Sequence, residues 1–356
     1  MINLEQIDFT KIIFLTGKNN FFGQTRKPWV SMKVQEIIFQ LKKSGFEIEN
    51  YEFQQVINKN IEIKNSIVFY AFSQNENVRN YIKDLIHYLS NFNNLIVPSY
   101  ELLLCHENKG YQELLKKQLN IESLKSFYFY DKSKIDYSDI RFPVVIKHVN
   151  GSNGKNVFLA KNKNELENKL SKFEKIDFLT KIDLIRRKYF RKNKDYKLYP
   201  DYSNKVDYLE YKEYVTKREN FILQEFIPNL KVDFRVLVIF EKYYITKRHN
   251  RDNDFRASGA KKFDFNFDVN FELLNYSKSF FEKFDVPFLS IDICESNNQY
   301  YIFEFQALHF GLNVFKLSEG FYNFQDRNWN FIKSKPNIEN EIAYGLSQYL
   351  KSKIRN

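Results

Sequence analysis

The first hundred residues alternate short apolar runs with amphipathic helical periods, and this alternation limits the folds open to the chain. Three apolar runs are typical of buried strands, and they cover residues 11–16, 66–72 and 95–98. Between them, one helical period ends at Gly45 and another covers residues 78–89. Strands that alternate with helices usually pair in parallel, so the sequence predicts an N-terminal α/β domain with a parallel sheet.

The pattern changes after residue 105. A helix is predicted over residues 109–119, and strand-rich sequence with hairpins follows until a last helix begins after Asn337. We therefore predict a domain boundary near residue 105.

A lysine-rich helical stretch occupies residues 161–220. Its basic residues include Arg186, Arg187, Lys188, Arg191, Lys192, Lys194 and Lys197. A solvated insertion explains such a stretch, and a surface that binds an anion or an acidic partner is the alternative.

Composition excludes several classes of protein. The chain has 356 residues, 43% of them hydrophobic and 18% aromatic, which is too apolar for a disordered protein. Cys105 and Cys294 fit no metal-binding spacing, so neither a disulfide framework nor a zinc ribbon is expected. No run is long and apolar enough to span a membrane, and the sequence predicts a soluble, cytoplasmic protein. The formal charge of +11 favours polyanions, acidic substrates or anionic lipid surfaces without choosing among them.

Two strands near the C-terminus carry facing carboxylates. A polar turn centred on Asn298 joins two apolar runs, and pairing around it puts Asp292 opposite Glu304. Because strand side chains alternate, Gln306 shares a face with Glu304. Facing carboxylates repel unless a cation lies between them, and oxygen ligands of this kind suit Mg2+ bound to phosphates. Solvent-facing carboxylates with partners elsewhere are the alternative.

A glycine-containing hairpin precedes this site in the chain. A strand that ends at Lys147 is followed by a loop and a second strand, and the loop consists of Gly151, Ser152, Asn153, Gly154 and Lys155. Glycines let backbone N–H groups close around phosphate oxygens, while the lysines add positive charge. The hairpin is either a phosphate-binding loop or an ordinary turn.

Two further strands lie between these hairpins. The first holds the segment Gln224, Glu225, Phe226 and Ile227, and the second carries Asp233 and Arg235 on one face. Arg248 and Arg256 follow. Guanidinium groups suit bidentate contacts with phosphate or carboxylate, although an ordinary ion pair explains each residue taken alone.

Taken in order, these segments resemble the ATP-grasp ligases, in particular the branch with the ribosomal-protein glutamate ligases and the D-alanine ligases. The similarity covers about residues 100–320. It implies nucleotide binding by Lys109, Lys147, Gly151, Ser152, Asn153, Gly154, Lys155, Gln224, Glu225, Phe226, Ile227 and, at the ribose, Asp233. It implies catalytic arginines at Arg235, Arg248 and Arg256, and ligands of Mg2+ or Mn2+ at Asp292, Glu304 and Gln306.

The resemblance also implies the architecture. A parallel-sheet domain over residues 1–105 would precede an ATP-grasp domain over residues 106–350, whose two α+β subdomains join at a hinge at Gln224. Two departures stand out: Gln306 replaces the Asn usual in the family, and the insertion over residues 161–220 is unusually long.

The activity implied is an ATP-dependent carboxylate–amine ligase that forms an amide through an acyl phosphate. A sugar acid or an amino acid in cell-surface glycan or metabolite biosynthesis is the expected acceptor, with Arg26 or Arg256 pairing with it. Residues 17–26 and 309–313 are expected to face the reacting carboxylate.

Two other functions stay open. A polyanion-binding protein would use the basic and aromatic residues of the insertion, which include Tyr189, Phe190, Tyr196 and Tyr199. An ATP-grasp kinase would phosphorylate its substrate without capture by an amine.

Overall fold

The computed structural model describes residues 2–23, 27, 29–150, 156–190, 206–250, 254–256 and 262–355. They form two compact units. Unit 1 comprises residues 1–124 and 227–356, and unit 2 lies within residues 125–226. The boundary near residue 105 and the hinge at Gln224 stay predictions.

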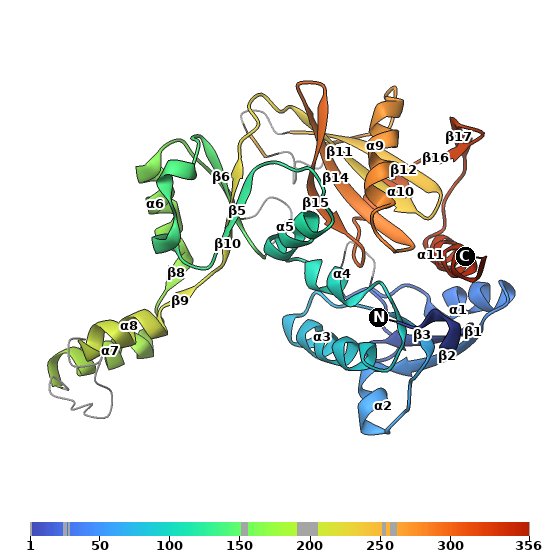
Figure 1. The fold of residues 1–356 in the computed structure, drawn as a ribbon, viewed down its shortest axis with the longest axis horizontal. Helices are drawn as coiled ribbons and strands as arrows, with labels where there is room; N and C mark the ends of the chain where they lie inside the picture. The colour runs from blue at the N-terminus through green and yellow to red at the C-terminus, as the bar shows by residue number, and fades with distance from the viewer. Residues whose placement is uncertain are drawn as a thin grey trace. The chain divides into compact units, whose positions relative to one another are not determined.

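The N-terminal part of unit 1 is a parallel sheet of four strands in the order β2-β1-β3-β4 (Figure 1). Its strands are β1 (Asp8–Thr16), β2 (Glu47–Glu52), β3 (Ser66–Tyr70) and β4 (Leu95–Val97). The parallel sheet predicted from β1, β3 and β4 is confirmed. The edge strand β2 escaped prediction because its sequence, EIENYE, is mostly polar and half-exposed.

The helices of this part are α1 (Val34–Lys43), α2 (Phe53–Asn58), α3 (Glu76–Ser90), α4 (Tyr100–Cys105) and α5 (Lys109–Gln118). Helix α1 ends at Gly45, whose φ of 99° belongs to the left-handed region that glycine adopts most easily. Helix α5 begins at Asn108, whose side chain accepts a hydrogen bond from the backbone N–H of Tyr111. Lys109 is therefore the first residue of α5, where the sequence predicted it.

The second part of unit 1 is a seven-stranded antiparallel sheet in the order β15-β14-β11-β12-β16-β17, with β13 also paired to β12. Its strands are β11 (Val232–Ile239), β12 (Lys242–His249), β13 (Lys262–Asp264), β14 (Phe288–Ser296), β15 (Gln299–Gln306), β16 (Gly320–Gln325) and β17 (Asn328–Lys333). Three helices accompany them: α9 (Phe271–Phe281), α10 (Asn313–Leu317) and α11 (Ile338–Arg355).

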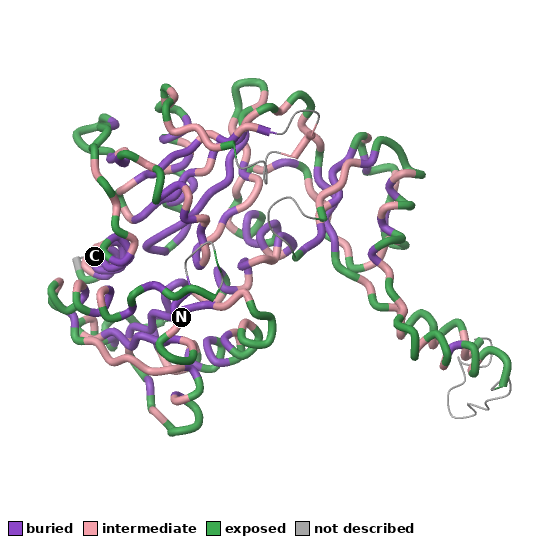
Figure 2. The backbone as a smooth tube through the Cα atoms, turned by 180° about the vertical axis from the view of Figure 1, so that it is seen from behind, coloured by how far each residue is buried: buried purple, intermediate pink, exposed green. Residues whose placement is uncertain are grey.

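The central strands of this sheet are buried on both faces (Figure 2). On one face, side chains such as Val236 and Ile291 pack with Leu274 of α9 in one core. On the other face, Leu237 and Tyr244 join the core of the N-terminal part. Charged side chains share this second face farther along the strands, so unit 1 holds them on a rigid support.

Unit 2 is built on an antiparallel sheet in the order β5-β10-β6-β7, packed against α6. Its elements are β5 (Ser126–Phe129), β6 (Val144–His148), β7 (Val157–Ala160), α6 (Lys163–Leu170), β8 (Glu174–Lys175), α7 (Phe178–Phe190), α8 (Asp207–Val215), β9 (Lys217–Arg218) and β10 (Phe221–Glu225). The short pair β8-β9 connects this body to the helical hairpin α7-α8 (Figure 1). The described residues of the predicted insertion thus include the helices α6, α7 and α8.

Two predicted features lie outside the described residues: the glycine loop over residues 151–155, and Arg26. The same holds for Arg191, Lys192, Lys194 and Lys197 of the insertion. Across the part of the chain that is described, no helix is long and apolar enough to cross a bilayer.

Candidate active site

Charged side chains form a row across four neighbouring strands of unit 1. Arg248 of β12 stands opposite Asp233 of β11, and Arg235 of β11 stands opposite Asp292 of β14. Asp292 in turn stands opposite Glu304 of β15, as the sequence predicted. Because residues opposite one another in a sheet share a face, the strand register alone brings the predicted arginines and carboxylates together.

A β-bulge at Phe303 sets the direction of the two outermost ligand candidates. Ile293 pairs with Ile302 but Asp292 pairs with Glu304, so Phe303 is an extra residue in β15. Ile302 and Phe305 both point into the core as a result. Regular alternation from Ile302 would have turned Glu304 into that core instead.

The bulge also corrects the predicted turn. The hairpin closes with Ser296 opposite Gln299, so its turn consists of Asn297 and Asn298, with φ of 52° and 59°. Asparagine tolerates this left-handed conformation, and two such residues suit a tight hairpin turn. The turn is therefore not centred on Asn298, and the predicted pairing of Asp292 with Glu304 holds because the bulge adds one residue.

The centre of the row is a buried ion-pair network. Nε and Nη2 of Arg235 donate to the two carboxylate oxygens of Asp292 at 2.7 and 2.8 Å. Nη2 of Arg248 lies 3.0 Å from Oδ2 of Asp292, and Arg248 also donates to both oxygens of Asp233. Burial raises the pKa of the Asp292 carboxyl, but the two guanidinium groups outweigh burial and hold that pKa below its usual range.

Gly311 lies directly against Arg235. A Cβ atom at residue 311 would stand 2.4 Å from Nη1 of Arg235, far inside van der Waals contact. Since Arg235 is fixed by its two hydrogen bonds to Asp292, it cannot move aside without losing them. The glycine after β15 therefore makes room for the arginine.

We expect Gly311→Ala to displace Arg235 from Asp292 and to lower the free energy of unfolding by about 1–3 kcal/mol. Thermal and denaturant unfolding of the single variants and of the double variant with Arg235→Ala measure this. In the Arg235→Ala background, adding Gly311→Ala should lower the free energy of unfolding by almost nothing further. Equal costs with and without Arg235 would contradict the role given to Gly311.

The outer end of the row is organised by an amide. Nε2 of Gln306 donates to Oε1 of Glu304 at 2.9 Å, and Oε1 of Gln306 lies 3.0 Å from Nδ1 of His106. Burial lowers the pKa of His106 to about 3, so the imidazole is neutral, and Nδ1 is the nitrogen that donates to the amide oxygen. Nζ of Lys109 lies 3.9 Å from Oε2 of Glu304.

Sequence reasoning missed two residues of this region. His106 follows α4 directly and orients Gln306. Gln112 of α5 accepts a hydrogen bond from the backbone N–H of Phe305 at 3.3 Å and so ties α5 to β15. The one signal was position, because both residues flank Lys109.

The donor set fits a hard cation. Glu304 offers an oxygen whose described ion-pair partner is 3.9 Å away, and its side chain is 27% exposed. Asp292 adds a second carboxylate of the type that binds Mg2+. The carbonyl oxygen of Gln306 is turned to His106 and its NH2 group to Glu304, so Gln306 joins this set only if its amide turns over. Asp292 is shared with two arginines, so Glu304 is the side chain most open to a metal.

In unit 2, the predicted nucleotide residues Lys147 and Gln224 meet on neighbouring strands. Nζ of Lys147 donates to Oε1 of Gln224 at 2.5 Å, and Nε2 of Gln224 donates to Oγ of Ser126 at 3.0 Å. Gln224 is buried, whereas Glu225 at the end of β10 is exposed. The segment from Gln224 to Ile227 thus changes from buried strand to accessible chain.

Two predicted residues have partners that bear on their proposed roles. Asp233 is 1% exposed and both its oxygens accept from Arg248, so contact with a ribose would require that pair to open. Arg256 pairs with Asp254 within the short described segment 254–256. Their assignments to the ribose and to catalysis stay predictions.

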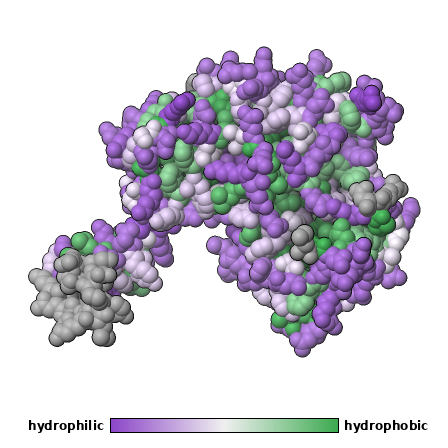
Figure 3. Space-filling model, viewed as in Figure 1, coloured by the Kyte–Doolittle hydropathy of each residue, from purple (hydrophilic) through white to green (hydrophobic). Residues whose placement is uncertain are grey.

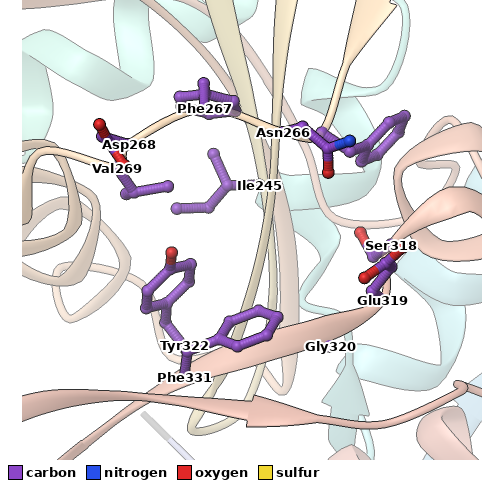
Figure 4. A pocket seen from close by; sticks show the side chains of 11 residues that line it. Ile245, Asn266, Phe267, Asp268, Val269, Ser318, Glu319, Gly320, Tyr322 and Phe331 are labelled. Atoms are coloured by element: carbon purple, nitrogen blue, oxygen red, sulfur yellow. The ribbon is translucent and has the colours of Figure 1, made fainter.

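A separate pocket of about 400 Å3 lies between β12, the chain before α9, and the β16-β17 hairpin (Figure 4). Its lining is mixed, with apolar side chains such as Ile245, Phe267 and Phe331 beside the polar Asn266, Asp268, Ser318 and Glu319. Ile245 packs into the core shared with α9, on the face of β12 opposite Arg248. The pocket is therefore not part of the charged row.

Comparison with known proteins finds one matching family model and several solved structures with a similar fold. A family model described as RimK-like ATP-grasp domain matches residues 107–198. The solved D-cycloserine synthetase DcsG superposes with a TM-score of 0.54 at 9% sequence identity, covering 96% of this chain and 99% of its own. Residues 107–198 therefore resemble an ATP-grasp domain, and the chain has the fold of the ATP-grasp proteins. The predicted resemblance and the predicted fold class are confirmed.

Two further solved structures share this fold. D-alanine–D-alanine ligase from Bacillus anthracis, complexed with ATP, superposes with a TM-score of 0.50 at 11% identity, covering 97% of this chain and 99% of its own. The ATP-grasp ligase PsnB, complexed with a minimal precursor, gives 0.51 at 10% identity, covering 97% and 100%. A search of curated proteins finds no match to the sequence. At these identities the likeness concerns the fold.

Proposed function

We propose that this ATP-grasp protein is an ATP-dependent carboxylate–amine ligase that works through an acyl phosphate. The row of Arg248, Arg235, Asp292 and Glu304 on one sheet face is the observation that carries the proposal. It combines guanidinium groups, which bind phosphoryl oxygens, with carboxylates, which bind a divalent cation. Neutralising charge during phosphoryl transfer requires both.

The residues of the row divide the work as follows. Glu304 and Asp292 would hold Mg2+, which supplies charge neutralisation for the triphosphate. Gln306 would join them once its amide oxygen turns away from His106. Arg235 is partly exposed and its hydrogen bonds to Asp292 fix its guanidinium group beside that site, so it binds the transferring phosphoryl group. Arg248 is buried against Asp233 and Asp292, so it would reach the phosphoryl group only if this network opened. His106 donates to Gln306 and orients its amide relative to Glu304.

No protein nucleophile is needed in this reaction. A substrate carboxylate attacks the γ-phosphoryl group, the bond between this group and the β-phosphate breaks, and ADP leaves behind an acyl phosphate. An amine then attacks the acyl carbon, phosphate leaves, and the nitrogen loses a proton to give the amide. Both cysteines of the chain are buried, and burial raises the pKa of the Cys105 thiol well above its usual value, so this thiol stays protonated.

For the two substrates we propose only a chemical class. A sugar acid or an amino acid, in cell-surface glycan or metabolite biosynthesis, is our proposed acceptor, and a small amine is the second substrate. Incubation with MgATP and pools of acids, with and without amines, tests this through release of phosphate. Hydroxylamine should trap the acyl phosphate as a hydroxamate. A stable phosphoester with no amine dependence would instead identify a kinase.

We expect Lys147→Met to weaken MgATP binding about tenfold or more, because a charged donor to phosphate is worth roughly 1.5–3 kcal/mol. The methionine keeps the apolar stem and removes the charge. Calorimetric titration measures the affinity. Lys172→Met is the matched control, since Lys172 is exposed on the same unit and belongs to none of the predicted nucleotide segments. Unchanged affinity in a folded Lys147 variant would remove this residue from the site.

A further inference from the structure

Helix α7 of unit 2 carries an apolar stripe that no described residue covers. Phe178, Ile182, Ile185 and Tyr189 are 74%, 49%, 56% and 56% exposed. Their spacing of four, three and four residues puts them on one narrow side of the helix. The hairpin is among the most exposed parts of the described chain (Figure 2), and hydrophobic atoms appear on its surface beside hydrophilic ones (Figure 3).

The other side of α7 packs against α8 and holds the α7-α8 hairpin together. Leu184 is buried there. Arg187 lies 3.3 Å from Asp207 of α8, and its guanidinium stacks 3.6 Å from the ring centroid of Tyr211. These contacts with α8 lie about half a turn away from the stripe. The stripe is therefore not needed to hold the two helices together.

Basic side chains border the stripe on both sides. By helical rotation, Lys181 and Lys188 lie along one border and Arg186 lies along the other. All three are exposed, and neither Lys181 nor Lys188 makes an ion pair with any described residue. Long cationic side chains can extend from such borders toward anionic groups while their stems cover apolar surface.

We propose that α7 binds the surface of an anionic phospholipid bilayer, with its apolar stripe in the interface and its basic borders at the headgroups. This arrangement of a narrow apolar face between cationic borders is that of interfacial helices. The net charge of +11 adds a long-range attraction to the same surface. The inference does not depend on the proposed ligase activity.

The charge around the stripe argues against a second copy of the chain as its occupant. A second copy would bring the same basic borders and the same net charge of +11 toward this helix, and like charges repel. An anionic bilayer attracts these borders instead. The exposed side chains of Leu179 and Phe190 lie beside the stripe on the side of Arg186 and would contact the same surface.

Vesicle flotation with the full chain tests the proposal, using phosphatidylcholine vesicles with and without phosphatidylglycerol. We expect binding to the anionic vesicles only, weakening with salt. The triple variant Ile182→Ser, Ile185→Ser, Tyr189→Ser should bind at least about tenfold more weakly. Lys181→Gln with Lys188→Gln should reduce binding about fivefold for each charge removed.

The matched control is Phe39→Ser, Ile57→Ser, Tyr88→Ser, which removes three exposed apolar side chains from unit 1. It should bind vesicles as the unchanged protein does. Circular dichroism and MgATP binding should show that every variant is folded. Failure of the unchanged protein to bind anionic vesicles overturns the proposal, and so does full binding by the stripe variant. If the unchanged protein sedimented as an oligomer and the stripe variant as a monomer, a second copy of the chain would be the occupant of the stripe instead.

Discussion

Glu304→Ala should reduce ligase turnover by about a thousandfold or more, because it removes the carboxylate most open to Mg2+ and leaves the phosphoryl transfer without its main metal ligand. The fold should survive, since Glu304 is partly exposed and its nearest described cation, Lys109, is 3.9 Å away. Loss of an ion pair that weak costs about 0–1 kcal/mol. Turnover and thermal unfolding, each measured with and without Mg2+, test both statements.

The hairpin that carries Glu304 also offers a control. Glu295 lies on β14 but is exposed and outside the charged row. Glu295→Ala should leave both turnover and the stabilisation by Mg2+ unchanged. If Glu304→Ala retained normal turnover, Glu304 would be an ordinary surface carboxylate and the site would have to be assigned elsewhere.

Asp292→Ala should have a different outcome, with loss of stability as well as activity. The carboxylate balances Arg235 and Arg248, and Arg248 is almost fully buried. Removing one partner of a buried network leaves uncompensated charge, which costs about 3–5 kcal/mol. Denaturant unfolding of this variant beside Glu304→Ala makes the comparison. Equal stability of the two variants would contradict the network described here.

The same network gives a pH dependence of stability. Because the folded-state pKa of Asp292 lies below its unfolded value, the carboxylate stabilises the fold at pH values above that unfolded value, near 4. This contribution is lost as pH falls below about 4 toward the folded-state pKa. Unfolding measured from neutral to acidic pH should show a steeper loss for the unchanged protein than for the less stable Asp292→Ala.

The sequence predicted the carboxylate pair and the strands that carry the arginines because apolar runs and turn residues that are close in the chain indicate strands and short hairpins. Asp292 and Glu304 belong to one hairpin, and counting from a turn centred on Asn298 paired them, because the error in the turn and the unforeseen bulge at Phe303 cancel. The pairing of Asp233 with Arg248 was not foreseen, because nothing local tells which charges neighbouring strands place opposite one another. Asp233 was assigned to a ribose from the resemblance to the ATP-grasp ligases, which does not indicate its partner in the sheet.

Other parts of the site depend on contacts between distant segments. His106 and Gln306 are 200 residues apart in the chain, and their hydrogen bond requires the packing of α4 and α5 beside β15. Gly311 is a second example, because it leaves room for the side chain of Arg235 and does not serve a turn. Such requirements arise only after folding, so a single sequence carries no periodic signal for them.

The bulge at Phe303 has a consequence for recognising this site in other genomes. In a regularly paired hairpin with the same turn, the residue facing Asp292 would stand at 303, one place earlier in the chain. Motif searches that fix the number of residues between the two acids would therefore separate bulged from regular hairpins, although both present the same pair of ligands. A search that allows the spacing between the two acids to vary by one residue would find both kinds of hairpin. The number of residues between the acids would then indicate which hairpins contain the bulge.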